Sequence, residues 1–304
     1  MDKAIFILGP TGCGKSRMAV NLAHKFNGEI ISADSVQVYK GFDIGSAKVT
    51  EKEMQGVAHH CIDICEAGDY FTVSDFVELT KKHIHEICSR GKLPIVVGGT
   101  GLYINSLVSG YNFGGTSRNE TFRAELEKEA KEKGLGSLWE RLHALNPETA
   151  DKIDKKNGRR LIRALEIATF GEEKTSEAVS EFEYKLFALT EERDGLYARI
   201  NKRVDEMLEA GLIDEVNGLL QNGAKPDSQP MRAIGYKEVV SFLQGECEQQ
   251  QMTELIKQHS RNYAKRQMTY LRGLEKTQNV EEVNVHDFAA GQKQMEEIIK
   301  EWIK

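Results

Sequence analysis

The chain has 304 residues, of which 40% are hydrophobic and 29% charged, with a net charge of −6 at pH 7. This length and composition suit one or two globular domains with a large core. No apolar run approaches the roughly 18 residues of a membrane span, and the chain begins with a strand-like segment rather than a secretory leader. We therefore expect no membrane association, a cytoplasmic location and reduced cysteines. Because the overall charge is negative, a nucleic-acid partner would have to be recognised by local basic clusters.

A phosphate-binding loop near the start is the strongest motif in the sequence. Residues 4–8 form an apolar strand, residues 9–16 then read G-x-x-x-x-G-K-S, and a helix with one apolar face follows. Glycines let backbone N–H groups converge on phosphate oxygens, and the helix N-terminus adds its dipole. Lys15 supplies a charge for the terminal phosphate, and the Ser16 hydroxyl is a ligand for Mg²⁺. The motif predicts a diphosphate or triphosphate site formed by Gly9, Pro10, Thr11, Gly12, Cys13, Gly14, Lys15 and Ser16.

Two further apolar strands end in residues suited to a site. Residues 28–33 run into Asp34, Ser35 and Gln37, and residues 94–97 run into Gly-Gly-Thr, which ends at Thr100. Ligands of an open α/β sheet lie beyond the carboxyl ends of its strands, so these residues are expected near the phosphate loop. A carboxylate at Asp34 suits Mg²⁺ ligation or a general base, but it equally suits a cap or an Asx turn.

The glycines after residue 97 allow either close approach of a ligand or a tight packing turn. The same strand ends without the Mg²⁺-holding aspartate that P-loop ATPases carry. That absence argues against a motor protein or a GTPase.

A helical insertion is expected from 111 to 195. Charge-dense helical segments near 120–133, 137–145 and 159–170 follow one another there. We therefore predict an α/β fold with a P-loop NTPase-like core, in which helices flank a parallel sheet, formed by residues 1–110 and 196–304. In the last helix of the insertion, Arg159, Arg160 and Arg163 can hold nucleic-acid phosphates or simply form a solvated face.

A long helix over residues 252–274 is locally basic. Residues 255–276 contain six lysines or arginines and one acid, and Lys257, Arg261, Lys265 and Arg272 form one stripe with Arg266 beside it. Such a stripe indicates nucleic-acid binding, with a solvated face as the alternative. Arg232 lies in a loop marked by proline and glycine. It can swing onto a diphosphate or be an ordinary surface arginine.

Taken in order, these motifs closely resemble those of the bacterial tRNA dimethylallyltransferases, which prenylate N6 of the adenosine 3′ to the anticodon. The resemblance covers nearly the whole chain. It rests on the phosphate loop followed by Asp34-Ser35-x-Gln37-x-Tyr39, Asp43-Ile44-Gly45-x-Ala47-Lys48, His59-His60-x-Ile62-Asp63, Gly98-Gly99-Thr100-Gly101-Leu102-Tyr103, Arg163-Ala164-Leu165-Glu166, Arg232-Ala233-Ile234-Gly235-Tyr236 and Ala264-Lys265-Arg266-Gln267.

The resemblance implies that the phosphate loop and Arg232 hold the diphosphate of dimethylallyl diphosphate, with Mg²⁺ bound at Ser16. It implies that Asp34 takes the proton from the adenine amine, assisted by Thr100, Lys15 and Arg232. The anticodon stem-loop of tRNA is then expected to contact Asp34, Ser35, Val36, Gln37, Thr100, Arg123, Arg159, Arg160, Leu161, Ile162, Arg163, Arg261, Lys265 and Arg266. A monomer is expected.

Three alternatives remain at this point. A kinase on the same core would move phosphate from ATP, and a prenyltransferase acting on free nucleotides would modify AMP. A non-enzymatic RNA-binding protein would bind RNA regardless of Lys15. Substrate tests separate the three.

Overall fold

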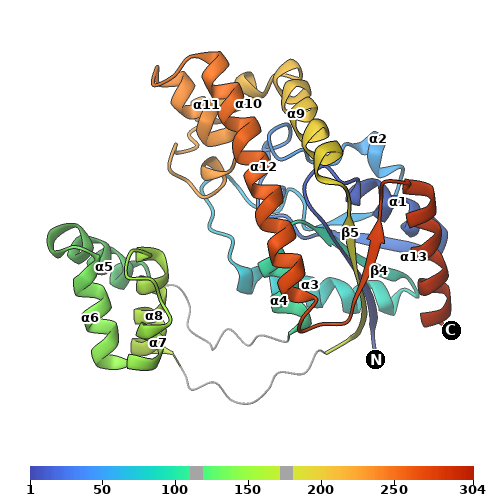
Figure 1. Ribbon diagram of the computed structural model, residues 1–304, viewed down its shortest axis with the longest axis horizontal. Helices are drawn as coiled ribbons and strands as arrows, with labels where there is room; N and C mark the ends of the chain where they lie inside the picture. Colours follow the sequence, from blue (N-terminus) through green and yellow to red (C-terminus); the bar gives the residue numbers. More distant parts are fainter. Residues whose placement is uncertain (110–118, 172–180) are drawn as a thin grey trace. The chain divides into compact units, whose positions relative to one another are not determined.

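The protein consists of two compact units, each with its own core (Figure 1). The computed structural model describes residues 1–109, 119–171 and 181–304. The core unit is Met1–Ser109 with Ser180–Lys304, and the insertion unit is Gly110–Val179. The predicted boundary near 110 falls outside the described residues. The predicted return at 195 is too late, because β5 (Glu183–Thr190) already belongs to the core sheet.

The core unit is built on one six-stranded sheet in the order β3-β2-β4-β1-β5-β6. Every neighbouring pair is parallel, which confirms the predicted α/β class. Strands covered on both faces are apolar throughout, and β1 and β4 are accordingly almost completely buried. The other strands are β1 (Lys3–Leu8), β2 (Gly28–Ser32), β3 (His59–His60), β4 (Leu93–Gly98) and β6 (Val280–Asn284).

Helices surround this sheet, and the one that matters most for the site is α12 (Gln249–Leu274). In Figure 1 it runs through the core unit from α11 to α4, and both helices contact it. The described helices of this unit are α1 (Lys15–Phe26), α2 (Glu51–Met54), α3 (Val73–Ser89), α4 (Gly101–Val108), α9 (Arg193–Glu209), α10 (Leu212–Gln221), α11 (Tyr236–Leu243), α12 and α13 (Phe288–Trp302), with a 3₁₀ turn at Pro230–Arg232.

The insertion unit is helical, as the sequence predicts. It contains α5 (Glu120–Lys133), α6 (Leu135–Leu145), α7 (Pro147–Asp151) and α8 (Gly158–Phe170). The short α7 is not predicted by periodicity. Leucines from α5, α6 and α8 form a small separate core, which includes Leu126, Leu138, Leu142, Leu161 and Leu165. Among the helices that the structure describes, none is long and apolar enough to cross a membrane.

Candidate active site

The candidate site lies where three neighbouring strands end. The sheet places β2, β4 and β1 side by side and parallel, so their carboxyl ends share one edge. Asp34 follows β2, Thr100 follows β4, and the phosphate loop follows β1. The strand-end argument made from the sequence therefore brings the right residues together.

Three cavities surround this edge. The phosphate cavity, of about 710 Å³, is lined by Gly12, Gly14, Lys15 and Ser16 from the phosphate loop, with Arg199 and Arg203. The entry cavity, of about 380 Å³, is lined by Asp34, Arg203, Arg232, Tyr263 and Arg266, among others. The inner cavity, of about 90 Å³, is lined by Lys15, Asp34, Gly99, Arg203 and Gln267, among others.

The phosphate loop has the shape that its sequence predicts. Gly12 and Gly14 adopt φ of 83° and 86°, a region that residues with a side chain rarely enter. The ammonium of Lys15 donates to the Pro10 carbonyl at 2.7 Å. Burial lowers the pKa of Lys15, while the neighbouring Cys13 thiol and Asp34 carboxylate oppose that shift. The protein therefore compensates the positive charge of the Lys15 ammonium only in part, and a bound anion would stabilise it further.

Gln267 on α12 fastens the phosphate loop to the end of β4. Its side-chain oxygen accepts from the Thr11 amide at 2.8 Å, and its Nε2 donates to the Gly99 carbonyl at 2.9 Å. A Cβ on Gly99 would lie 2.1 Å from that Nε2, and one on Gly101 would lie 2.2 Å from the Tyr270 ring. Close packing against α12 therefore explains these glycines. Of the two explanations that the sequence leaves open, a ligand or a tight packing turn, the packing turn accounts for them.

The Asp34 carboxylate has one oxygen committed and one available. Oδ1 accepts from the Val36 amide at 2.8 Å and the Gln37 amide at 3.2 Å, which is the expected turn. Oδ2 accepts no hydrogen bond from any residue that the structure describes, and Asp34 lines both the entry and inner cavities. Asp34 can therefore form the turn through Oδ1 and still act as a general base or a Mg²⁺ ligand through Oδ2.

Gln37 holds a loop in place through both ends of its amide. Ser32 Oγ donates to its Oε1 at 3.0 Å, and its Nε2 lies 3.3 Å from the carbonyl oxygens of Ser46 and Ala47. Gln37 also lines the inner cavity, and its Oε1 has a second lone pair, so the predicted contact with a nucleotide is compatible with these bonds. Ser35 and Val36, in contrast, line the entry cavity directly.

Thr100 lies behind the site and lines none of the three cavities. Its hydroxyl is buried and has no hydrogen-bond partner in the described part of the chain. The Tyr263 hydroxyl lies close to it, and burial together with the Asp34 charge raises the pKa of Tyr263 to about 12. Tyr263 is therefore neutral at physiological pH and can donate a hydrogen bond.

Arg203 on α9 is the functional candidate that sequence reasoning missed. It and Ala47 are the two described residues that line all three cavities. Its Nη1 lies 3.4 Å from Thr11 Oγ1, and burial lowers its pKa while Asp34 opposes the shift. A signal existed, because Arg203 falls on the same helical stripe as the inward-facing Ile200 and Met207.

Arg232 has a more peripheral position than predicted. It is exposed at the end of the 3₁₀ turn and lines the entry cavity but not the phosphate cavity. The structure therefore brings Arg232 near Asp34, whereas Arg203 is the arginine that lies beside Lys15.

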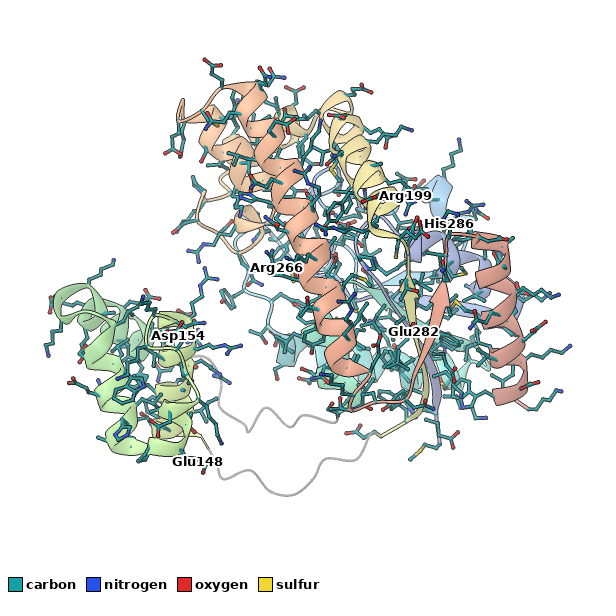
Figure 2. All side chains as sticks on the ribbon, in the orientation of Figure 1. Glu148, Asp154, Arg199, Arg266, Glu282 and His286 are labelled. Atoms are coloured by element: carbon teal, nitrogen blue, oxygen red, sulfur yellow. The ribbon has the colours of Figure 1, made fainter. Side chains whose placement is uncertain are left out.

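The basic face of α12 is divided between structural and available groups. Arg261 Nη1 donates to Asn201 Oδ1 at 2.5 Å, which ties it to α9. Lys265 and Arg266 are exposed and line a groove of about 780 Å³ along α12. Arg266 also reaches the entry cavity, and Figure 2 shows it projecting from this helix.

Two of the predicted RNA-binding arginines in the insertion unit hold a buried carboxylate. Glu166 is completely buried and accepts from Arg123 Nη2 at 2.7 Å, Arg163 Nη1 at 2.5 Å and the Asn119 amide at 2.8 Å. Burial favours protonation, but these bonds outweigh it and hold the pKa of Glu166 at about 2. Arg123 and Arg163 are therefore first of all structural.

At the beginning of α8, two arginine side chains are exposed and the two apolar side chains that follow are buried. Arg159 and Arg160 are exposed and available to a partner. Leu161 and Ile162 are buried in the core of the insertion unit, so the prediction that they bind tRNA through their side chains is wrong. Their apolar character reflects packing.

The residues around Ser16 fit a magnesium ion bound mainly through phosphate. Mg²⁺ usually takes one or two protein ligands and keeps waters beside phosphate oxygens. Ser16 is exposed and lines both the phosphate and inner cavities, with Glu53 and Glu206 also lining the phosphate cavity. The described residues contain no cluster of three acidic, histidine or cysteine side chains that would hold a metal unaided.

Comparison with known proteins agrees with this arrangement. A model of the family described as IPP transferase matches residues 37–274. A tRNA dimethylallyltransferase of Exiguobacterium sp. is 48% identical over 270 residues, or 88% of this chain and 86% of that protein. A full-length tRNA isopentenylpyrophosphate transferase structure from Bacillus halodurans has 40% identity and a TM-score of 0.70, and the match covers 99% of this chain and 100% of that one. A eukaryotic dimethylallyltransferase acting on tRNA has 29% identity and a TM-score of 0.81, over 95% of this chain and 75% of that one. The chain belongs to the IPP transferase family, and it is an enzyme of the tRNA dimethylallyltransferase type.

Proposed function

We propose that this protein transfers the dimethylallyl group of dimethylallyl diphosphate to N6 of the adenosine 3′ to the anticodon of tRNA, releasing diphosphate. The observation that carries the proposal is the position of Asp34. Its unused oxygen lies at the inner and entry cavities, beside a phosphate loop, so two substrates can meet there.

The diphosphate is the leaving group, and the phosphate loop binds it. As the bond between the allylic C1 and oxygen breaks, negative charge gathers on the diphosphate. Backbone amides of Gly12, Gly14, Lys15 and Ser16, together with the Lys15 ammonium and the Arg203 guanidinium, neutralise that charge. When bound at Ser16, Mg²⁺ would supply further charge neutralisation on the same oxygens.

The adenine amine is the nucleophile and reaches Asp34 through the entry cavity. Its lone pair is delocalised into the ring, so attack on C1 requires loss of an N–H proton as the new N–C bond forms. Asp34 Oδ2 accepts this proton. The Tyr263 hydroxyl is placed to hydrogen-bond the base, which must leave the anticodon-loop stack to enter, and Thr100 lies beside Tyr263 and would support it.

Basic side chains on both units are available to the tRNA backbone. Lys265 and Arg266 line the groove on α12, and Arg159 and Arg160 are exposed on α8. Phosphate contacts of this kind position an RNA without reading its sequence. Binding should therefore weaken with added salt.

The test uses labelled dimethylallyl diphosphate with Mg²⁺ and unmodified tRNA, in parallel with AMP and with labelled ATP plus tRNA. Label on an adenosine of the tRNA is the expected result. Label on AMP alone would indicate a nucleotide prenyltransferase, and phosphate transfer from ATP would indicate a kinase. RNA binding without any product would indicate a non-enzymatic protein.

The role of Asp34 is tested with Asp34→Asn, which keeps the turn-forming oxygen. General-base catalysis contributes about 10²–10⁴-fold, so turnover should fall by at least 100-fold while the Kd for tRNA stays within about threefold. Asp214→Asn on α10 is the matched control, since Asp214 is exposed and lines none of the three cavities. Parallel losses of turnover and tRNA affinity would remove Asp34 from the role of base.

A further inference from the structure

The loop of residues 43–48 lines the same cavities as Arg203. Gly45, Ser46 and Ala47 line the entry cavity, and Ala47 also lines the phosphate and inner cavities. Ala47 has a φ of 48°, a left-handed conformation that costs about 1–3 kcal/mol for a residue with a side chain. Surrounding contacts must therefore hold this loop in its shape.

Glu215 on α10 binds one side of the loop. Its carboxylate accepts from the backbone amides of Asp43 at 3.1 Å, Ile44 at 2.7 Å and Gly45 at 3.2 Å. It also accepts from the Tyr236 hydroxyl at 2.8 Å. Hydrogen bonds to a charged acceptor are roughly twice as strong as neutral ones, so this is a strong attachment.

Tyr236 on α11 extends the same attachment by one residue. Its hydroxyl oxygen accepts from the Ser46 amide at 3.2 Å while its proton is donated to Glu215. The ring is completely buried, and a Cβ on Gly45 would lie 2.6 Å from it. Burial and the Glu215 charge raise the pKa of Tyr236, so its hydroxyl remains a donor. Four consecutive loop amides, 43–46, are thus held by two side chains.

The other side of the loop is fixed independently. Gln37 Nε2 lies 3.3 Å from the carbonyl oxygens of Ser46 and Ala47, and Gln37 is joined to Ser32 at the end of β2 by the bond from Ser32 Oγ. The loop therefore lies between the sheet and the α10–α11 pair, with Ala47 facing the point where the cavities join. If either attachment were lost, Ala47 could relax from its strained conformation. The distance between Ala47 and Arg203, which both line all three cavities, would then change.

We infer that Glu215 is a positioning residue for the transfer reaction: by holding the loop of residues 43–48, which lines the same cavities as Arg203, it sets the gap in which the allylic carbon meets the adenine amine. Glu215 itself lines none of the three cavities, so it acts only through the loop. The inference rests on the proposed function, because it assigns that gap to the reaction.

The experiment measures kcat, the Kd of each substrate and the melting temperature for Glu215→Gln and Tyr236→Phe. Glutamine keeps one acceptor oxygen but loses the charge and two of the four bonds, and phenylalanine keeps the packing while removing only the hydroxyl. We expect kcat to fall about 10-fold or more in Glu215→Gln and less in Tyr236→Phe. Substrate dissociation constants should stay within about threefold in both.

Asp214→Asn is the control, because it removes an adjacent exposed charge from the same helix. A double variant with Arg203→Lys adds a second readout: if the two residues set one gap, their effects on kcat are not multiplicative. A purely structural role predicts unchanged kcat in the folded fraction and multiplicative effects. That result, or kcat within twofold of wild type in both single variants, would overturn the inference. Absence of transfer by the wild-type enzyme would instead refute the proposed function.

Discussion

Replacing Arg203 with methionine is the sharpest test of the charge arrangement at this site. Methionine keeps much of the length and volume of the side chain and removes its charge. Two unit charges 4 Å apart interact by about 4 kcal/mol at an effective dielectric of about 20. Removing one donor to a developing oxyanion typically lowers kcat about 10²–10³-fold, or about 2.7–4 kcal/mol. Because Arg203 is the arginine beside Lys15, we expect a loss in that range.

The same substitution should leave the fold intact or stabilise it. Burial lowers the pKa of Arg203, which means that its charged form is costly in the absence of a ligand. The melting temperature of Arg203→Met is therefore expected to equal or exceed that of wild type. A lower kcat in a protein of unchanged stability would place the effect in catalysis rather than in folding.

The assay is single-turnover transfer from labelled dimethylallyl diphosphate at saturating tRNA, with the Kd for the diphosphate measured by calorimetry. Arg232→Met is the comparison, and its exposed side chain should cost at most about tenfold, since solvent screens exposed charges. Lys293→Met, on α13, controls for loss of a surface charge. If Arg203→Met stays within threefold of wild type, or Arg232→Met loses more, the assignment based on the cavities is wrong.

Three further outcomes are expected. Glu166 is ionised with a pKa of about 2 in the folded insertion unit against 4.5 as its ordinary value, so it stabilises that unit above about pH 4.5, and this contribution should disappear as the pH falls toward about 2. Unfolding followed by Trp139 fluorescence in a Trp302→Phe background would show it, and Glu166→Gln should flatten the pH dependence. Gly99→Ala should lower the melting temperature, because its Cβ would lie 2.1 Å from a nitrogen of Gln267 and moving that amide breaks its bonds to Thr11 and Gly99; no change in scanning calorimetry would argue against that packing. Ser16→Ala should shift the Mg²⁺ activation curve to higher concentration without changing tRNA affinity in a filter-binding assay, whereas an unchanged curve would exclude Ser16 as a ligand.

Local sequence signals were sufficient where a residue's role depends on its immediate neighbours. The phosphate loop and Asp34 are set by a strand and the few residues after it, and the sheet order then brings them together. Residues whose role depends on distant partners were harder to assign. Arg203 and Glu215 lie on ordinary amphipathic helices. The helical stripe shows that Arg203 points inward, but the sequence does not say which loop either residue meets.

The errors have equally physical causes. Leu161 and Ile162 were grouped with adjacent arginines, although the helical period sends them into the core of the insertion unit. The short elements α2, α7 and β3 contain two to five residues each, too few to show a periodicity. The predicted boundary at 195 leaves the strand Glu183–Thr190 in the insertion, although that strand already belongs to the core sheet.

The bond between Thr11 and Gln267 also bears on how the enzyme is made. The two residues are 256 positions apart, and chains emerge from the ribosome at about 5–20 residues per second. The phosphate loop is thus synthesised well before the helix that secures it. A nascent chain would carry the whole phosphate-binding motif for tens of seconds without its final support, so ligand affinity should develop only after α12 has docked. Translation stalled before residue 249 should therefore yield ribosome-bound chains that bind diphosphate poorly.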